Sequence, residues 1–80
     1  MVRNEKIYNK QLKHIGGLLR EYRFSNGLSQ SDLSSIINVH RNTISNIEQG
    51  KNITLMKLFE MTDGLEIDLV DLFSDIDDLY

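Results

Sequence analysis

One local pattern, which marks the start of an α-helix, occurs four times between residues 28 and 72 of this 80-residue chain. In each copy an apolar residue precedes a residue that can cap a helix, and a second apolar residue follows four positions after the cap. The two apolar side chains pack together as a hydrophobic staple, which fixes the angle at which the chain enters the helix. The copies are Leu28-Ser29…Leu33, Val39-His40…Ile44, Ile53-Thr54…Leu58 and Ile67-Asp68…Leu72. The pattern therefore predicts four successive helices.

A longer helix is predicted before these four, because apolar residues recur there at close to the 3.6-residue period of an α-helix. Gly27 is a suitable left-handed stop for this helix. The pair Gly16-Gly17 interrupts it with poor helix formers, so either another backbone packs closely at this point or the helix begins near Ile15. The residues that define the apolar face are Ile7, Leu12, Ile15, Leu19 and Tyr22.

The linkers between the helices carry residues that suit short turns. Asn38 tolerates a left-handed conformation, Gly50 follows the third helix, and Gly64 follows the fourth. No segment alternates with the two-residue period of a strand, and a chain with zero Pro and five Gly has few residues for β-turns. The predicted fold class is all-α, with five helices at about 8–25, 30–37, 41–49, 55–63 and 69–78.

Composition excludes several kinds of function. With zero Cys, the chain can form no disulfide, cysteine-ligated metal site or cysteine nucleophile, which favours a reducing cytoplasm. No apolar run is long enough for a membrane span or a secretory signal. His14 and His40 are too far apart for a local metal motif, and no arrangement of residues supports an enzyme. We therefore expect no metal, no cofactor, no small-molecule ligand and no catalysis.

Charge is distributed unevenly along the chain. The net charge is −3, which by itself argues against a nucleic-acid partner. Residues 1–51, however, carry eight Lys or Arg against four Asp or Glu, a net +4, whereas residues 52–80 carry one against eight, a net −7. This asymmetry is consistent with DNA binding by the basic part, although two solvated surfaces of opposite charge would give the same pattern.

The second and third predicted helices, joined by Asn38-Val39-His40, have the size of a helix-turn-helix. On the third helix, Ile44 and Ile47 fall on one face. The opposite face has hydrogen-bond donors and acceptors and no carboxylate, which favours contact with bases in the DNA major groove over a simply solvated surface. The residues on that face are Arg41, Asn42, Ser45 and Asn46.

These residues resemble the phage repressor and Cro family of helix-turn-helix regulators, the XRE type. The resemblance extends from about Ile15 to Phe73. Its most specific parts are Gly-Leu-Ser-Gln at 27–30, followed by Leu33, and Ile-Ser-x-Ile-Glu-x-Gly at 44–50. Further matching positions are Ile15-Gly16, Leu19-Arg20, Arg23 and Val39.

The resemblance implies a compact five-helix, lambda-repressor-like domain whose third helix enters the major groove. It implies that Arg23 and Glu48 form a mostly buried ion pair. It also implies two sets of DNA contacts. Base-reading side chains are expected at Arg41, Asn42, Ser45 and Asn46. The resemblance places Gln30 at a phosphate and Thr43 near the backbone or a thymine methyl. Phosphate contacts are also expected at Ser29, Gln49 and Lys51. Lys10 and Lys13, like Lys51, are candidates for phosphate contact because they are basic groups in the first half of the chain.

The chain departs from the family pattern around the turn. Asn38 stands where the family usually has glycine, His40 where it has a serine cap, and Ser34 where it prefers alanine. The segment after Gly50 is one residue short and lacks the usual proline. These departures bear on the turn and on the start of the reading helix.

An apolar stripe runs through the acidic C-terminal segment, about 68–80. Part of the stripe must close the core, and the remainder suggests a homodimer interface, which the fifth helix often provides in this family. The alternative is a tail folded back on its own domain. The stripe consists of Leu69, Leu72, Phe73, Ile76, Leu79 and Tyr80.

The sequence thus predicts one DNA-binding domain over residues 1–80, with an N-terminal extension at 1–10 and the helix-turn-helix at about 29–49. The predicted function is a cytoplasmic, sequence-specific transcriptional regulator that binds a palindromic operator as a homodimer. A phage or mobile-element repressor and a restriction-modification controller both fit this description. The alternative is a protein-interaction module, or an antitoxin, that uses the same fold to hold a protein partner.

Overall fold

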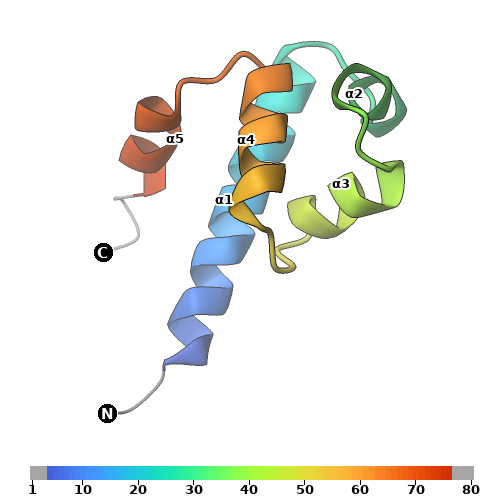
Figure 1. The fold of residues 1–80 in the computed structure, drawn as a ribbon. Helices are drawn as coiled ribbons and strands as arrows, with labels where there is room; N and C mark the ends of the chain where they lie inside the picture. Colours follow the sequence, from blue (N-terminus) through green and yellow to red (C-terminus); the bar gives the residue numbers. More distant parts are fainter. Residues whose placement is uncertain (1–3, 77–80) are drawn as a thin grey trace.

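The computed structural model describes residues 4–76, and its regular structure consists of five α-helices (Figure 1). No strand occurs in this range, so the all-α prediction is confirmed. The boundaries differ from those predicted by at most three residues, apart from the end of the fifth helix, whose predicted last two residues lie outside the described range. The helices are α1 (Glu5–Ser25), α2 (Gln30–Ile37), α3 (Arg41–Glu48), α4 (Leu55–Gly64) and α5 (Leu69–Ile76).

All four predicted caps accept a hydrogen bond from a backbone N–H in the first turn of their helix. The four pairs are Ser29 with Asp32, His40 with Asn42, Thr54 with Lys57, and Asp68 with Val70, at 2.9–3.1 Å. Such bonds satisfy N–H groups that have no partner within the helix, and each contributes about 1 kcal/mol. The local pattern therefore sets where α2 to α5 begin.

The start of α2 is a full capping box. The Ser29 hydroxyl accepts from the Asp32 N–H, and the Asp32 carboxylate accepts from the Ser29 N–H at 2.9 Å. The backbone hydrogen bond from Ser29, and then its side-chain bond, lower the pKa of Asp32 below 3.8. Because the folded pKa lies below the unfolded one, this stabilisation is present at neutral pH and is lost as the pH falls through the folded pKa.

Helix α1 begins at Glu5, three residues earlier than predicted. Asn4 caps it by accepting from the Ile7 N–H at 3.3 Å, and Glu5 places a negative charge at the positive end of the helix dipole. Residues 5–10 of the predicted N-terminal extension therefore form the first turns of α1. At 1.5 Å per residue the 21-residue helix is about 31 Å long, in a molecule whose longest extent is 42 Å. Among the described residues, no helix is both long and apolar enough to cross a membrane.

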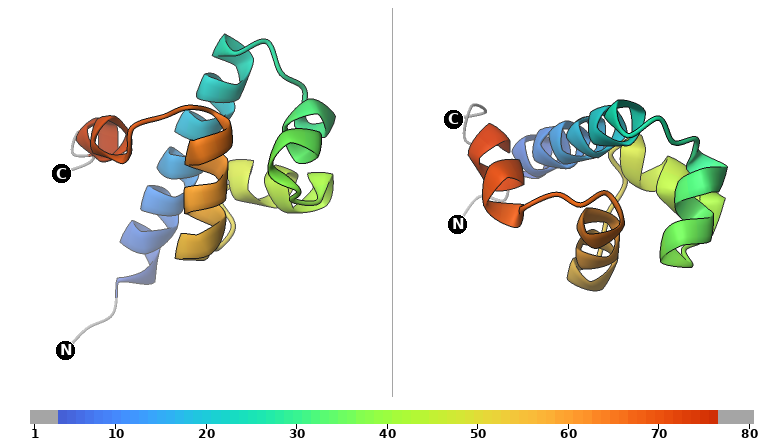
Figure 2. Two further views of the ribbon diagram at one scale, coloured as in Figure 1. Left: turned by 45° about the horizontal axis from the view of Figure 1, so that its top comes forward. Right: turned by 90° about the horizontal axis from the view of Figure 1, so that it is seen from above.

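Helix α1 is the central element of the fold. Helices α2 and α3 lie on one side of it and α5 on the other, while α4 packs on α2 (Figure 2). Their apolar faces meet in one core, as the staple pattern requires. The buried apolar side chains are Leu19, Leu33, Val39, Ile44, Ile47, Leu58, Met61, Leu65 and Leu72.

Gly16 lies where the backbones of α1 and α3 meet. A Cβ atom at this position would collide with the carbonyl oxygen of Ile47 and would lie 3.0 Å from that of Glu48. A second close approach lies one turn earlier on α1, at Lys13. A Cβ atom added to Gly50, which follows α3, would collide with the side chain and backbone of Lys13. The first of the two predicted alternatives for Gly16-Gly17 is therefore confirmed, because another backbone does approach closely and α1 is continuous through both glycines.

Three helices end in the same hydrogen-bonded turn, in which a residue with positive φ follows the C-cap. At the ends of α1 and α3 this residue is a glycine, Gly27 (φ 69°) or Gly50 (φ 90°). At the end of α4 it is Glu66 (φ 57°), and the N–H groups of Glu66 and Ile67 bond back to the carbonyls of Asp63 and Thr62.

The prediction that Gly64 forms the turn after the fourth helix is wrong. Gly64 is the last residue of α4, and a Cβ atom there would collide with Cγ2 of Ile37. The glycine is therefore required for the contact between α2 and α4, and the left-handed turn is made two residues later by Glu66.

Candidate nucleic-acid interface

The turn between α2 and α3 is made by Asn38, Val39 and His40. Asn38 adopts a left-handed conformation, with φ 55° and ψ 39°, so it serves where the family usually has glycine. The Ser34 hydroxyl donates a hydrogen bond to the carbonyl oxygen of Val39, whose side chain is buried in the core. Two of the departures from the family pattern, Asn38 and Ser34, therefore act together to fix the turn.

His40 caps the N-terminus of α3. Its Nδ1 atom accepts a hydrogen bond from the Asn42 N–H at 3.0 Å, which requires a neutral imidazole with the proton on Nε2. No acidic residue occurs in the first turn of α3. The start of the helix is therefore capped without a negative charge near the predicted reading side chains.

Helix α3 separates a buried face from a polar one, as predicted. Ile44 and Ile47 are buried in the core, whereas the side chains of Arg41, Asn42 and Asn46 are exposed. Thr43 and Ser45 lie at the border of the two faces and are half-buried. The exposed face thus offers a guanidinium, two amides and a hydroxyl, and it has no carboxylate.

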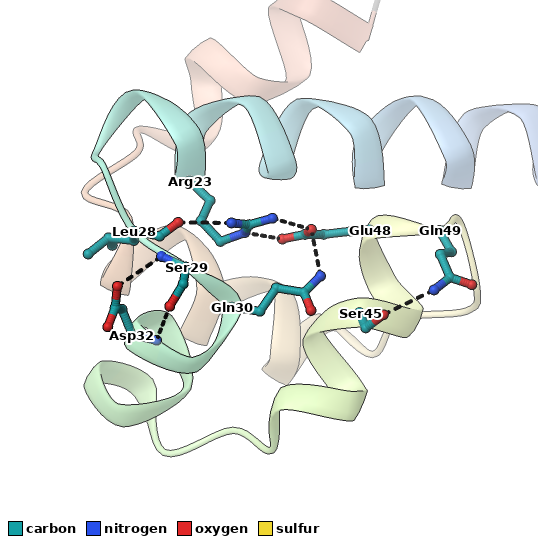
Figure 3. A network of polar contacts seen from close by, with 8 residues as sticks. All are labelled: Arg23, Leu28, Ser29, Gln30, Asp32, Ser45, Glu48 and Gln49. Atoms are coloured by element: carbon teal, nitrogen blue, oxygen red, sulfur yellow. Dashed lines mark hydrogen bonds and ion pairs between the residues drawn. The ribbon is translucent and has the colours of Figure 1, made fainter.

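Arg23 and Glu48 form a two-point ion pair between α1 and the end of α3 (Figure 3). Arg23 Nε lies 2.7 Å from Glu48 Oε2 and Nη2 lies 2.9 Å from Oε1, with side chains only 6% and 3% exposed. Arg23 Nη1 also donates to the Leu28 carbonyl at 2.8 Å. The hydrogen bonds to Glu48 raise the pKa of Arg23, so the guanidinium stays charged. The structure thus has the ion pair that the family resemblance implied.

The amide of Gln30 joins this ion pair. Its Nε2 donates to Glu48 Oε1 at 3.1 Å, which holds the side chain at the start of α2 and over the end of α3 (Figure 3). At the C-cap of α3, Gln49 Nε2 donates to the Ser45 hydroxyl at 3.0 Å. Each amide retains its oxygen and a second N–H for another partner. Of the other expected phosphate contacts, Ser29 and Lys51 are exposed at the two ends of the motif.

A polar pocket of about 290 Å³ lies between α1, α2 and α3 and brings several of these residues together. Sequence reasoning assigned no contact to Arg20, which lines this pocket as well. The signal was available, since Arg20 lies one turn before Arg23 on α1, but the partners on α2 and α3 become neighbours only in the fold. The full lining is Arg20, Arg23, Gln30, Ser45, Glu48 and Gln49.

The residues expected at a dimer interface have different environments. Leu72 must be removed from that set, because its side chain is fully buried in the core and has no surface left for a second copy. Phe73 is 46% exposed and Leu69 is half-buried. Ile76 is the last residue of α5, and Leu79 and Tyr80 lie outside the described residues.

Helices α4 and α5 expose further apolar side chains that sequence reasoning did not assign to an interface. A groove of about 520 Å³ runs between the two helices, with Phe59, Ile67 and Leu69 among its lining residues. The staple pattern identified where α4 begins but not which of its apolar residues stay outside the core. The additional exposed side chains are Leu55, Met56, Phe59 and Val70.

Comparison with known protein families gives a match to Helix-turn-helix (HTH_3) over residues 19–72. The matched segment contains the ion pair, the turn and the whole of α3, and it covers about two thirds of the chain. The chain belongs to this helix-turn-helix family. It is of the XRE type, so the family resemblance found in the sequence is confirmed.

Solved structures include close matches to this helix-turn-helix chain. The wild-type restriction-modification controller protein C.Esp1396I aligns with a TM-score of 0.77 and 28% sequence identity over 86% of this chain and 91% of that chain. The C.Esp1396I tetramer in complex with its natural 35 base-pair operator aligns with the same TM-score and identity, over 86% and 92%. A comparison with curated proteins finds no match.

Proposed function

We propose that this chain is a sequence-specific DNA-binding regulator of transcription, of the restriction-modification controller type, that reads its operator with α3. The observation that carries the proposal is the helix-turn-helix with a carboxylate-free exposed face, in a chain similar to a controller protein solved on its operator. The assigned role is binding, without a catalytic step, and its expected location is the cytoplasm.

The side chains on the exposed face of α3 suit the edges of bases in the major groove. A guanidinium pairs with two acceptors of guanine and an amide pairs with adenine, so we assign these roles to Arg41 and to Asn42 and Asn46. Ser45 can contact either kind of base edge. The hydrogen bond from Gln49 already holds the Ser45 hydroxyl in place, which limits the freedom lost on binding.

Phosphate contacts would fix the position of α3 in the groove without reading sequence. Gln30, held against Glu48, and Gln49, held against Ser45, each have a free N–H on the amide for a phosphate oxygen. The exposed Ser29 and Lys51 lie at the two ends of the motif, and the half-buried Thr43 lies at the edge of the reading face.

The expected result of neutralising the reading face is a loss of sequence discrimination. After an operator is selected from random duplex DNA, Arg41→Ala and Asn42→Ala should each reduce the preference for it over random duplex by about 1–3 kcal/mol. Fluorescence anisotropy at fixed salt measures both affinities. Lys57→Ala, on α4, is the matched control and should leave the preference unchanged. Wild-type discrimination in both variants would contradict the assignment of α3, and failure to enrich any sequence would favour a protein-interaction module.

We also propose that the chain acts as a homodimer through the apolar surface of α4 and α5. Phe59, Val70 and Phe73 are 49%, 69% and 46% exposed, and Phe59 also lines the groove between the two helices together with Ile67 and Leu69. Exposed apolar surface next to a groove is typical of a protein–protein interface. A two-fold axis through this surface would place two reading helices about 34 Å apart, one turn of duplex, so the operator should be a rough palindrome.

Introducing charge at this surface is expected to separate the dimer. Phe73→Asp and Phe59→Asp should each shift the mass measured by light scattering at tens of micromolar from dimer to monomer, because a carboxylate would be buried without a partner. Ile36→Asp, at a 56% exposed residue of α2, is the matched control and should leave the mass unchanged. A wild-type chain that is monomeric at this concentration would remove the dimer and the palindrome together.

A further inference from the structure

Helix α1 carries a stripe of positive charge that the proposed reading of DNA by α3 does not use. The stripe contains six residues, four of them cations, at successive spacings of four, three, four, three and four. Because each residue turns the helix by about 100°, all six lie within an arc of about 80° around the helix axis. The four cations are exposed. The stripe consists of Lys6, Lys10, Lys13, Gly17, Arg20 and Phe24.

Arg20 connects this stripe to the helix-turn-helix. It lines the polar pocket between α1, α2 and α3, together with the amides of Gln30 and Gln49 and the hydroxyl of Ser45. Its guanidinium lies 5.1 Å from the centre of the Phe24 ring, a cation–π contact that keeps it at the pocket wall. Among the side chains that the structure describes, those of residues 4–74, no carboxylate lies within ion-pairing distance of Arg20.

The pocket has a net positive charge because its other ions cancel. Arg23 and Glu48 neutralise each other, and both Glu48 oxygens already accept hydrogen bonds. Arg20 therefore supplies the unbalanced charge, and the surrounding amides and hydroxyl supply neutral donors. An anion with several acceptor oxygens, such as a phosphate, matches this set of donors.

The stripe also passes the C-terminal end of α3. Lys13 packs against Gly50, the residue that ends the turn after the reading helix. Between Lys13 and Arg20 lies Gly17, where a Cβ atom would meet nothing within 4 Å. The surface of α1 is therefore low at this point and leaves room for a backbone to pass between the two cations.

We propose that α1 is a track for the DNA backbone: one phosphate occupies the Arg20 pocket, and the strand continues along Lys13, Lys10 and Lys6. This inference rests on the proposed function, since it assigns a further contact of the same operator. Arg20 and Lys6 are 14 residues apart, or about 21 Å along a helix. The track would thus contact phosphates beyond the base pairs that α3 reads.

The first test replaces the charge in the pocket. Arg20→Gln should weaken binding to operator and to random duplex by about the same factor, near tenfold, and should make the plot of log affinity against log salt shallower by about 0.9. Arg20→Lys should restore the salt slope but only part of the affinity, because lysine is a point charge without the planar fork of arginine. Lys57→Gln, in the acidic part of the chain at residues 52–80, should change neither the affinity nor the salt slope.

The second test varies the length of the duplex. Shortening the DNA flanks beyond the selected operator should weaken wild-type binding, but it should have little effect on Lys6→Gln/Lys10→Gln/Lys13→Gln, which has already lost the contacts. Equal sensitivity of the two proteins to flank length, or a wild-type salt slope for Arg20→Gln, would overturn the track. If either result were found while Arg41→Ala still lost sequence discrimination, the proposed function would be retained and only the track along α1 would be rejected. Thermal melts of all variants verify that these exposed positions do not alter folding.

Discussion

Glu48→Ala is expected to lower the free energy of unfolding by about 3–5 kcal/mol, a large share of the 5–15 kcal/mol typical of a small domain. Among the described residues, the substitution would leave the Arg23 guanidinium, whose side chain is 6% exposed, with the Leu28 carbonyl as its one remaining hydrogen-bond acceptor and the Phe24 ring as an uncharged neighbour. It would also remove the acceptor of the Gln30 amide. The cost arises because a buried charge has lost its counter-charge. It is measured as a lower urea midpoint with an unchanged dependence of the unfolding free energy on urea concentration.

Two controls separate this effect from a general loss of surface charge. The other ion pair among the described residues, Lys57–Glu60, spans 3.5 Å with side chains 40% and 31% exposed, so Glu60→Ala should cost less than about 1 kcal/mol. The double variant Arg23→Met/Glu48→Met, which removes both charges and keeps apolar volume, should recover most of the stability. A urea midpoint for Glu48→Ala equal to that of Glu60→Ala would show that the pair does not anchor α3.

The sequence predicted the beginnings of the helices well because each beginning is encoded locally. Ser29, His40, Thr54 and Asp68 all cap the helices for which they were predicted, within five residues of the staple partners that identified them. The end of α4 was predicted less well because it depends on a tertiary contact. Gly64 is required by the Ile37 side chain from α2, and no local rule would choose Glu66 for the left-handed turn.

The site shows the same division between local and long-range information. The alternation of buried and polar residues on α3 could be seen in the sequence, since a helix fixes which residues share a face. The ion pair joins positions 25 residues apart and was implied only by the family resemblance. The pocket at Arg20 was missed because three helices form it, and the exposure of Phe59 was missed because apolarity alone does not distinguish core from surface.

The adjacent glycines of α1 are expected to respond in opposite directions to the same substitution. In most helices Gly→Ala stabilises by about 1 kcal/mol, since alanine restricts the unfolded chain and is the better helix former. Gly16→Ala should instead destabilise by about 1–3 kcal/mol, the usual cost of overpacking. Its Cβ would collide with the Ile47 carbonyl oxygen, and this is backbone that cannot rotate away as a side chain would.

Gly17→Ala is the matched control, because nothing lies within 4 Å of the added Cβ and the helix there is regular, so it should gain about the usual 1 kcal/mol. Urea unfolding of both variants measures the difference in sign. Relief of the collision at Gly16 requires α3 to move away from α1, which also stretches the Arg23–Glu48 bonds of 2.7 and 2.9 Å. Gly16→Ala should therefore weaken operator binding even at temperatures where it stays folded, because α3 carries the reading side chains. A stabilising Gly16→Ala would mean that the two helices do not meet at this point.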